Sequence, residues 1–415
     1  MRVNVVLCVA VAGCLSFLTS AAVADTGQAQ WLHVSKDAVD VHATAASNNR
    51  ALIIARAASV PTTSARQYAV IIRRDPRRTK LVRLRSLPQT LGEVVAVQSD
   101  ARGRWIILSR PQTGPALVTR LTAAGNLDVS FAVGGSASLT TNPIAIEVDH
   151  ANRPVILGDA GPAANGSTTT VLTRLTQAGT VDSSFGVAGT AAAGPDMDAA
   201  ATRLGVPKAS IIVTPRSIAI TKSSGVVVSG AVIDPLAGSL GFLTALNQAG
   251  AAQATFGSGG TVIYGPKRSD PLRPGELGRF VEVDPLFGNI LTLGQATADD
   301  RSVIWRRTAH GARYGDFGVH GWLRLIRLAR PVAFGMTCRM GPVVADERTI
   351  TAFTRVGQPE RRFGVSGTIK LRTDVLLDHL DVADIDQTAC ALFGVAARTR
   401  AGSGGIAVKW FTLPA

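Results

Sequence analysis

One short pattern recurs along this chain, and its clearest copy is Val171–Thr190. Further copies lie at Leu117–Ser136 and Phe242–Thr261, and weaker ones begin at Val303 and at Ile350. Each copy has an alternating apolar strand, a turn with glycine, a Phe-Gly or Phe-Ala step, and a new strand. An internal repeat of this kind is typical of solenoids, propellers and arrays, so it decides the fold class before any other feature.

The spacing of the copies fits a unit of four short strands. Period-two alternation within each copy indicates strands rather than helices. Gly125, Gly179 and Gly250 stand at hairpin positions where a positive φ is needed. We predict that the motif phenylalanine plugs the space between neighbouring units, with a role as an exposed stacking platform as the alternative. These phenylalanines are Phe131, Phe185, Phe256, Phe317 and Phe363.

A second sequence signature gives the number of repeat units. An apolar strand, a polar turn and a very apolar strand occur together seven times, at Val41–Ala55, Val94–Leu108, Ile144–Leu157, Ile218–Val228, Phe280–Leu293, Val332–Val344 and Ile385–Val395. The last unit ends at Phe411–Ala415 after its third strand, whereas an orphan strand, Gln30–Ser35, precedes the first unit. A closed ring in which these ends share a blade would remove an exposed edge. We therefore predict an all-β fold, a seven-bladed β-propeller of four-stranded blades over residues 25–415.

Two insertions join an outer strand to the next inner strand, so both are expected on one face of the ring. Gly194–Ser210 is predicted to hold a short helix, capped by Asp196 or Asp198 and stopped by Gly205. The other, Gly265–Arg279, is rich in proline and glycine and has a basic excess. Its basic residues are the predicted ligand-binding residues: Lys267, Arg268, Arg273 and Arg279.

Residues 1–24 have the features of a secretory signal peptide. Arg2 is the basic region, Val3–Leu18 is the apolar region, and a small-residue site predicts cleavage after Ala24. The alternative is a lipobox that ends at Cys14, which would make the protein a lipoprotein. The apolar run is too short for a convincing membrane span. We expect export to the periplasm or the exterior, with no membrane span.

Two cysteines, Cys338 and Cys390, remain after cleavage. They lie about one unit apart, and an oxidising compartment favours a disulfide between adjacent units. The alternative is two buried free thiols that pack as small apolar groups.

The repeat resembles the bacterial delta-60 repeat, a family that is expected to form β-propellers. The residues that match its pattern are Arg174, Gly179, Asp182, Phe185, Gly186 and Gly189. The copy at Leu117–Ser136 matches with Ala132 in place of a glycine. The copy at Phe242–Thr261 lacks both the arginine and the aspartate, and the first and last units barely match. The resemblance covers about three-fifths of the chain, and it implies an architecture but no activity.

No motif for chemistry was found. The chain has no nucleophile elbow, no His-Glu-x-x-His, no Cys-x-x-Cys and no P-loop. His310, Asp316 and His320 are the nearest approach to a metal cluster, but they occupy turn positions and are interpreted as solvated loop residues. Asp384 and Asp386 on the last inner strand could act in a central channel, although a hydrated lining is the simpler interpretation. We predict no catalytic residue, metal or cofactor.

Charge is the remaining clue to function. The formal net charge is +14, and arginine far outnumbers lysine among the 43 basic residues. Arginine suits planar recognition of carboxylate and phosphate groups. We predict an exported, non-enzymatic and monomeric binding or scaffold module with a basic loop face, whose partner is a protein or an anionic glycan. The alternatives are a hydrolase or lyase on an anionic polysaccharide and a structural envelope component. Nucleic acid is not expected, because exposed aromatic residues are not interleaved with the basic ones.

Overall fold

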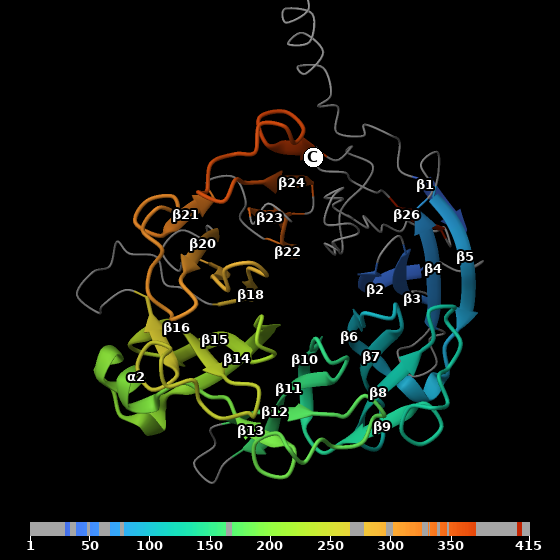
Figure 1. Ribbon diagram of the computed structural model, residues 1–415, viewed down its shortest axis with the longest axis horizontal. Helices are drawn as coiled ribbons and strands as arrows, with labels where there is room; N and C mark the ends of the chain where they lie inside the picture. Colours follow the sequence, from blue (N-terminus) through green and yellow to red (C-terminus); the bar gives the residue numbers. More distant parts are fainter. Residues whose placement is uncertain are drawn as a thin grey trace, which may run out of the picture.

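A computed structural model describes residues 30–33, 39–47, 50–57, 67–74, 79–162, 168–265, 278–295, 302–325, 331, 333–337, 341–346, 348–370 and 405–408. Strands in these ranges form six four-stranded antiparallel sheets and one two-stranded sheet. Within each four-stranded sheet, the order in space follows the order along the chain. The sheets are arranged around a common centre with the first strand of each innermost, so the chain is an all-β propeller (Figure 1).

The six four-stranded sheets are named blades 1 to 6 in chain order. Blade 1 contains β2 (Val39–Ser47), β3 (Arg50–Ala57), β4 (Gln67–Arg74) and β5 (Thr79–Ser86). Blade 2 contains β6 (Glu93–Ser99), β7 (Trp105–Arg110), β8 (Ala116–Leu121) and β9 (Ser136–Leu139). Blade 3 contains β10 (Asn142–Val148), β11 (Pro154–Pro162), β12 (Thr168–Arg174) and β13 (Thr190–Ala192).

Blade 4 contains β14 (Ile212–Ile220), β15 (Val226–Asp234), β16 (Gly238–Leu246) and β17 (Thr261–Tyr264). Blade 5 contains β18 (Phe280–Val283), β19 (Ile290–Gln295), β20 (Ser302–Arg307) and β21 (Trp322–Leu325). Blade 6 contains β22 (Ala333–Met336), β23 (Pro342–Ala345), β24 (Thr349–Ala352) and β25 (Thr368–Lys370).

The hydrophobic core lies between blades rather than within any one of them. One cluster joins Val155 and Leu157 of blade 3 to Val226 and Val228 of blade 4. Strands in the middle of a blade are covered on both faces by neighbouring blades, which is why their sequences are nearly continuous apolar runs. The inner and outer strands keep the alternation of apolar and polar residues by which the repeat is recognised in the sequence.

The predicted number of four-stranded blades is wrong: the described residues contain six, not seven. The remaining sheet pairs β1 (Gln30–His33) with β26 (Gly405–Val408), antiparallel, with Gln30 opposite Val408. The predicted partnership of the two terminal segments is therefore found, beside blade 1 (Figure 1). The last unit lacks the Phe-Gly or Phe-Ala turn that joins a third strand to a fourth in blades 2 to 6, so the repeat does not specify a complete seventh sheet. Its expected strands at Ile385–Val395 lie outside the described residues.

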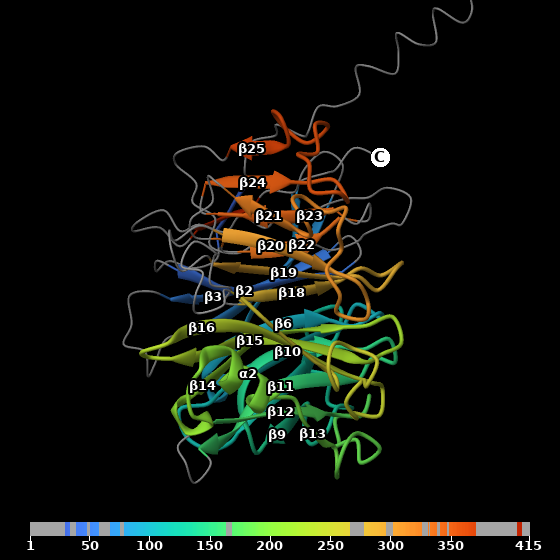
Figure 2. The ribbon, with the colours of Figure 1, turned by 90° about the vertical axis from the view of Figure 1, so that its left-hand side faces the viewer.

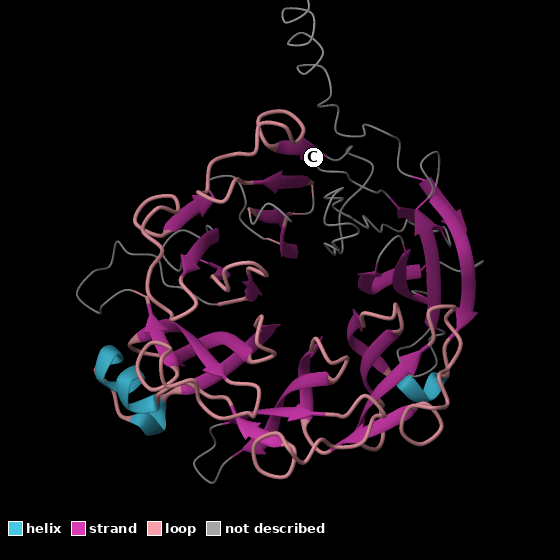
Figure 3. Ribbon diagram, viewed as in Figure 1, coloured by secondary structure: helices cyan, strands magenta, loops and turns pink. Residues whose placement is uncertain are grey.

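The predicted helix in the first insertion is present as α2 (Met197–Leu204). Asp196 caps its start by accepting from the backbone N–H groups of Asp198 and Ala199, and Gly205 ends it with a φ of 68°. Arg203 donates to two backbone carbonyls of blade 4, so the helix is fixed at the periphery (Figures 2 and 3). Two short 3-10 helices, η1 (Gln89–Leu91) and η2 (Lys208–Ser210), complete the helical elements of the described chain.

None of the helices in the described ranges has the length and apolar character needed to cross a membrane. The predicted signal peptide, its cleavage site after Ala24 and the alternative lipid site at Cys14 lie outside the described residues, and so do Cys338 and Cys390.

Candidate functional site

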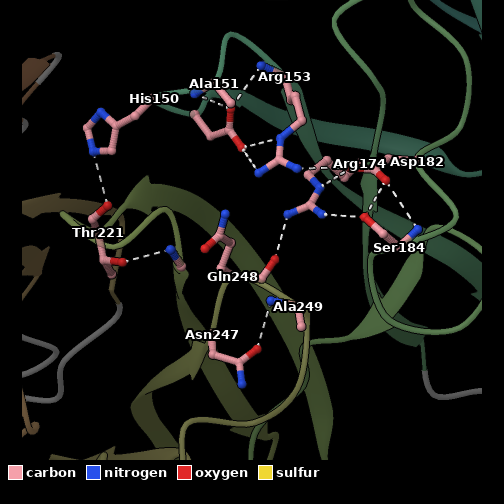
Figure 4. Close-up of polar contacts among 12 residues, drawn as sticks. His150, Ala151, Arg153, Arg174, Asp182, Ser184, Thr221, Asn247, Gln248 and Ala249 are labelled. Carbon is pink, nitrogen blue, oxygen red and sulfur yellow. Dashed lines mark hydrogen bonds and ion pairs between the residues drawn. The ribbon is translucent and has the colours of Figure 1, made fainter.

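The repeat motif forms a polar junction between neighbouring blades. In blade 3, Arg174 donates from Nε to Asp182 at 2.8 Å and from Nη1 to the carbonyl of Gln248 in blade 4 at 2.6 Å (Figure 4). Its guanidinium lies 4.5 Å from the centre of the Phe185 ring. Ser184 accepts from the same arginine and donates to Asp182. Every polar group of this motif is thus engaged within the protein.

Blade 2 repeats this junction. Arg120 donates to Asp128 at 2.7 Å and to the carbonyl of Gln177 in blade 3 at 2.6 Å, and it lies 4.5 Å from the Phe131 ring centre. Because both arginines bond a carbonyl in the following blade, the motif arginine ties blade 2 to blade 3 and blade 3 to blade 4.

The motif phenylalanine and the turn glycine of the next blade fit together. All five motif phenylalanines are fully buried, which confirms their role as plugs and excludes an exposed stacking role. Gly250 has a φ of 80°, and a Cβ there would lie 2.8 Å from the Gly186 nitrogen and 3.1 Å from the Phe185 ring. The Gly186 N–H donates to the Ala249 carbonyl at 2.7 Å, so glycine is required for this close approach.

Blade 5 keeps the arginine but changes its partner. Tyr314 occupies the position of Asp182, and Arg306 instead donates to Asp284, at 2.9 Å, from the turn between the first two strands of the same blade. Both side chains have no solvent exposure. Burial lowers the pKa of Arg306, and the negative charge of Asp284 opposes that change. This pair could not be read from the sequence, because Arg306 lies in β20 and Asp284 lies in the turn between β18 and β19.

The acid stability of the junctions gives a first prediction. Burial raises the pKa of Asp182, but hydrogen bonds from Ser184 and the charge of Arg174 outweigh it, so its pKa lies below the ordinary value. A depressed carboxyl pKa stabilises the fold above the unfolded-state pKa of about 3.9, and this stability is lost as the pH falls through the folded-state value.

We therefore expect Asp182→Asn to reduce the acid sensitivity of the protein. The free energy of unfolding, measured by urea titration at several values below about pH 5, should fall less steeply for the variant than for the native chain. Parallel curves over that range would show that Asp182 makes no contribution through its ionisation.

A pair of arginines on adjacent inner strands has the features of a ligand site. Arg216 of β14 and Arg279, which directly precedes β18, each lie five residues before the first residue of the following turn, so they are equivalent positions of blades 4 and 5. The two inner strands are joined by a bond from the Val281 N–H to the Ser217 hydroxyl at 3.3 Å. Both arginine side chains are exposed.

The electrostatics of this arginine pair favour an anion. Partial burial lowers the pKa of Arg279, and the positive charge of Arg216 lowers it further. The Arg279 guanidinium lies 5.3 Å from the Phe280 ring centre, which holds it in place. Within the described ranges, no carboxylate forms an ion pair with either arginine. Two guanidinium groups on adjacent inner strands, without a described carboxylate partner, are suited to a carboxylate, sulfate or phosphate group.

A β-bulge explains why the Arg216 side chain is presented. Arg216 is an extra residue in the pairing of β14 with β15, a β-bulge. Ile144, Val95 and His42 are the extra residues at the equivalent place in blades 3, 2 and 1. A bulge re-aims one side chain and is often found beside binding sites. In blades 4 and 5, the residue at this place is arginine.

The residues singled out from the sequence have mixed outcomes. Arg279 is described and belongs to the arginine pair, whereas Lys267, Arg268 and Arg273 lie outside the described residues, as do Asp384 and Asp386. Sequence reasoning missed Arg216, although its equivalence to Arg279 by position in the repeat was an available signal.

The turn residues first considered for a metal are exposed in blade 5: His310, Asp316 and His320. In the described part of the chain, no three histidine, cysteine, aspartate or glutamate side chains gather as a metal site would require. Glu147 on an inner strand accepts from Gln98 of the adjacent blade at 2.8 Å.

Comparison with known proteins supports the fold and goes no further. No protein-family model matches the chain, and no curated protein matches it either. Among solved structures, the WD40 domain of Toxoplasma gondii coronin has a TM-score of 0.52 at 9% identity, with 94% of this chain and 86% of that one covered. This similarity agrees with a β-propeller and shows nothing about activity.

Two further solved structures are more distant. The β-propeller domain of the Trilobed protease from Pyrococcus furiosus has a TM-score of 0.41 at 8% identity over 76% of this chain and 80% of that one. Pyrococcus horikoshii acylaminoacyl peptidase has a TM-score of 0.48 at 9% identity over 93% of this chain and 54% of that one.

Proposed function

We propose that this chain is an exported, non-enzymatic β-propeller that binds an anionic partner, an acidic glycan or an acidic protein segment, through the arginine pair Arg216 and Arg279. The observation that carries the proposal is that equivalent positions of two adjacent blades present guanidinium groups, with no described carboxylate paired to either. Separate inner strands hold the two groups, so their spacing is fixed by the fold before the ligand arrives.

We also propose that the chain belongs with the delta-60 repeat propellers and that the β1–β26 sheet closes the ring. Support for the first comes from the motif residues, which act together as one junction between blades. Support for the second comes from the pairing of Gln30–His33 with Gly405–Val408. Export rests on the signal-peptide pattern of residues 1–24.

The binding proposal predicts the effect of reversing the charge of the pair. The double variant Arg216→Glu/Arg279→Glu should bind polygalacturonate, an acidic glycan, at least about tenfold more weakly than the native chain, because two charge-assisted hydrogen-bonding groups are replaced by repulsive ones. Native binding should weaken steeply as salt is raised. Affinity is measured by titration calorimetry at two salt concentrations.

Arg102→Glu/Arg361→Glu is the matched control, because Arg102 is exposed in the turn between the first two strands of blade 2 and Arg361 is exposed in the turn between the last two strands of blade 6. It makes the same change in net charge as the double variant and should retain native affinity. Equal losses in the control and the double variant would mean that net charge, not a site, governs binding. Absence of salt-sensitive binding by the native chain would overturn the proposed function.

A further inference from the structure

Blade 5 has an aromatic and basic cluster on its third and fourth strands. Trp305 of β20 and Trp322 of β21 lie opposite each other, with ring centres 5.9 Å apart and planes inclined by 22°. The Arg313 guanidinium lies 5.5 Å from the Trp305 ring centre, and that of Arg307 lies 6.0 Å from it. Tyr264 of blade 4 approaches Trp305 at 6.4 Å. These five residues are called the rim cluster.

Comparison with the other blades shows that the two tryptophans depart from the repeat pattern. In the other four blades with the motif, the same cross-strand pair consists of small hydroxyl residues: Thr119 with Ser136, Thr173 with Thr190, Thr244 with Thr261, and Thr351 with Thr368. The hydroxyl groups of Thr119 and Ser136 lie 2.8 Å apart. Four blades thus fold with a threonine or serine pair where blade 5 has two tryptophans.

The arginines depart from the repeat in the same place. Arg307 faces Arg313 across a bridge that in the other motif blades joins Leu121 to Leu127, Leu175 to Val181, Leu246 to Ala252, and Phe353 to Pro359. Arg307 is 4% exposed, so a guanidinium has replaced a buried apolar group. Burial of such a charge costs stability, so packing does not account for it. Breaks in local rules that gather at one place are typical of functional sites.

The cluster also has free binding capacity. Trp305 is 7% exposed, and among the described residues its indole N–H has no hydrogen-bond acceptor. Arg313 is exposed, and no carboxylate of the described chain pairs with it. Trp322 is only half-buried. The partly exposed ring of Trp322 and the open guanidinium of Arg313 are therefore presented together.

We propose that the rim cluster is a second binding site, for one residue of an acidic saccharide. The apolar face of the sugar ring would lie on Trp322, and its carboxylate or sulfate would accept hydrogen bonds from Arg313. The inference rests on the proposed function only for the class of ligand. Single-stranded nucleic acid fits less well, because it is bound by successive aromatic platforms along a basic groove, and here there is one platform.

The test uses the residues of blade 3 as replacements. Trp322→Thr/Arg313→Val gives blade 5 the side chains of Thr190 and Val181, which the fold already accepts at the equivalent positions. With trigalacturonate as the probe, the native chain should bind at two sites by calorimetry and change its tryptophan emission. In the variant, affinity at one of the two sites should fall at least about tenfold. The change in tryptophan emission should be lost as well.

The arginine pair provides the matched comparison. Arg216→Glu/Arg279→Glu should keep the rim site and its change in emission. If Arg216→Glu/Arg279→Glu binds no trigalacturonate and the blade 5 variant binds as the native chain does, the rim site is overturned and the proposed function stands. If the native chain binds at the rim cluster but not at the arginine pair, the proposed function is overturned and the rim site stands. A response to oligothymidylate in place of trigalacturonate, or a native response from the blade 5 variant, would also overturn the rim site.

Discussion

Asp284→Ala should lower the free energy of unfolding by about 3–5 kcal/mol, the cost of leaving a buried charge without its partner. The Arg306 guanidinium has no solvent exposure, and Asp284 is its ion-pair partner. Asp284 also accepts backbone N–H groups of Leu286 and Phe287, so the substitution releases the turn as well. Urea denaturation followed by circular dichroism measures the change.

Two controls separate burial of charge from loss of a salt bridge in general. Glu93→Ala removes an exposed partner of Arg110, and it should change stability by less than about 1 kcal/mol. The double variant Asp284→Leu/Arg306→Met removes both charges, and it should recover most of the loss. If Asp284→Ala costs no more than Glu93→Ala, the Arg306 charge is not dependent on this partner.

Phe185→Ala should cost about 3–5 kcal/mol, the range for truncation of a buried aromatic side chain. The ring fills the junction between blades 3 and 4, where it contacts Gly250, and it carries the guanidinium of Arg174 on its face. Its loss therefore opens a cavity and frees the arginine that ties the two blades. The midpoint of thermal or urea unfolding measures the effect.

Val187 is the matched control for Phe185, because it lies two residues further along the same turn and is 84% exposed. Val187→Ala should change stability by less than about 0.5 kcal/mol. Equal losses for the two variants would mean that the turn, and not the buried ring, stabilises the junction.

Local patterns predicted much of this fold. The alternation of the repeat indicated its strands, the recurrence of Phe131 and Phe185 indicated buried plugs, and the sequence before Gly205 indicated a capped helix. Each of these features depends on residues close together in the chain, and for that reason each could be read directly. The pairing of the terminal strands was accessible by a different argument, the need to remove an exposed edge.

Contacts between blades could not be predicted from local sequence patterns. The motif arginine was visible, but its bond to a carbonyl of the following blade, as between Arg174 and Gln248, depends on how sheets pack. Arg306 of β20 pairs with Asp284, which lies in the turn between β18 and β19. The site was predicted from the basic segment around Arg279 because charge is visible locally, whereas Arg216 is distant in sequence and close only in the ring. The predicted blade number was wrong, because it counted the strand signature of the last unit although that unit lacks the Phe-Gly turn to a fourth strand.

The central claim is that Arg216 and Arg279 together hold an anionic group. A crystal structure of the protein with trigalacturonate tests it most directly. The account predicts a ligand carboxylate between the two guanidinium groups, within hydrogen-bonding distance of both, about 2.7–2.9 Å. Ligand bound with both arginines in contact with solvent alone would contradict the claim.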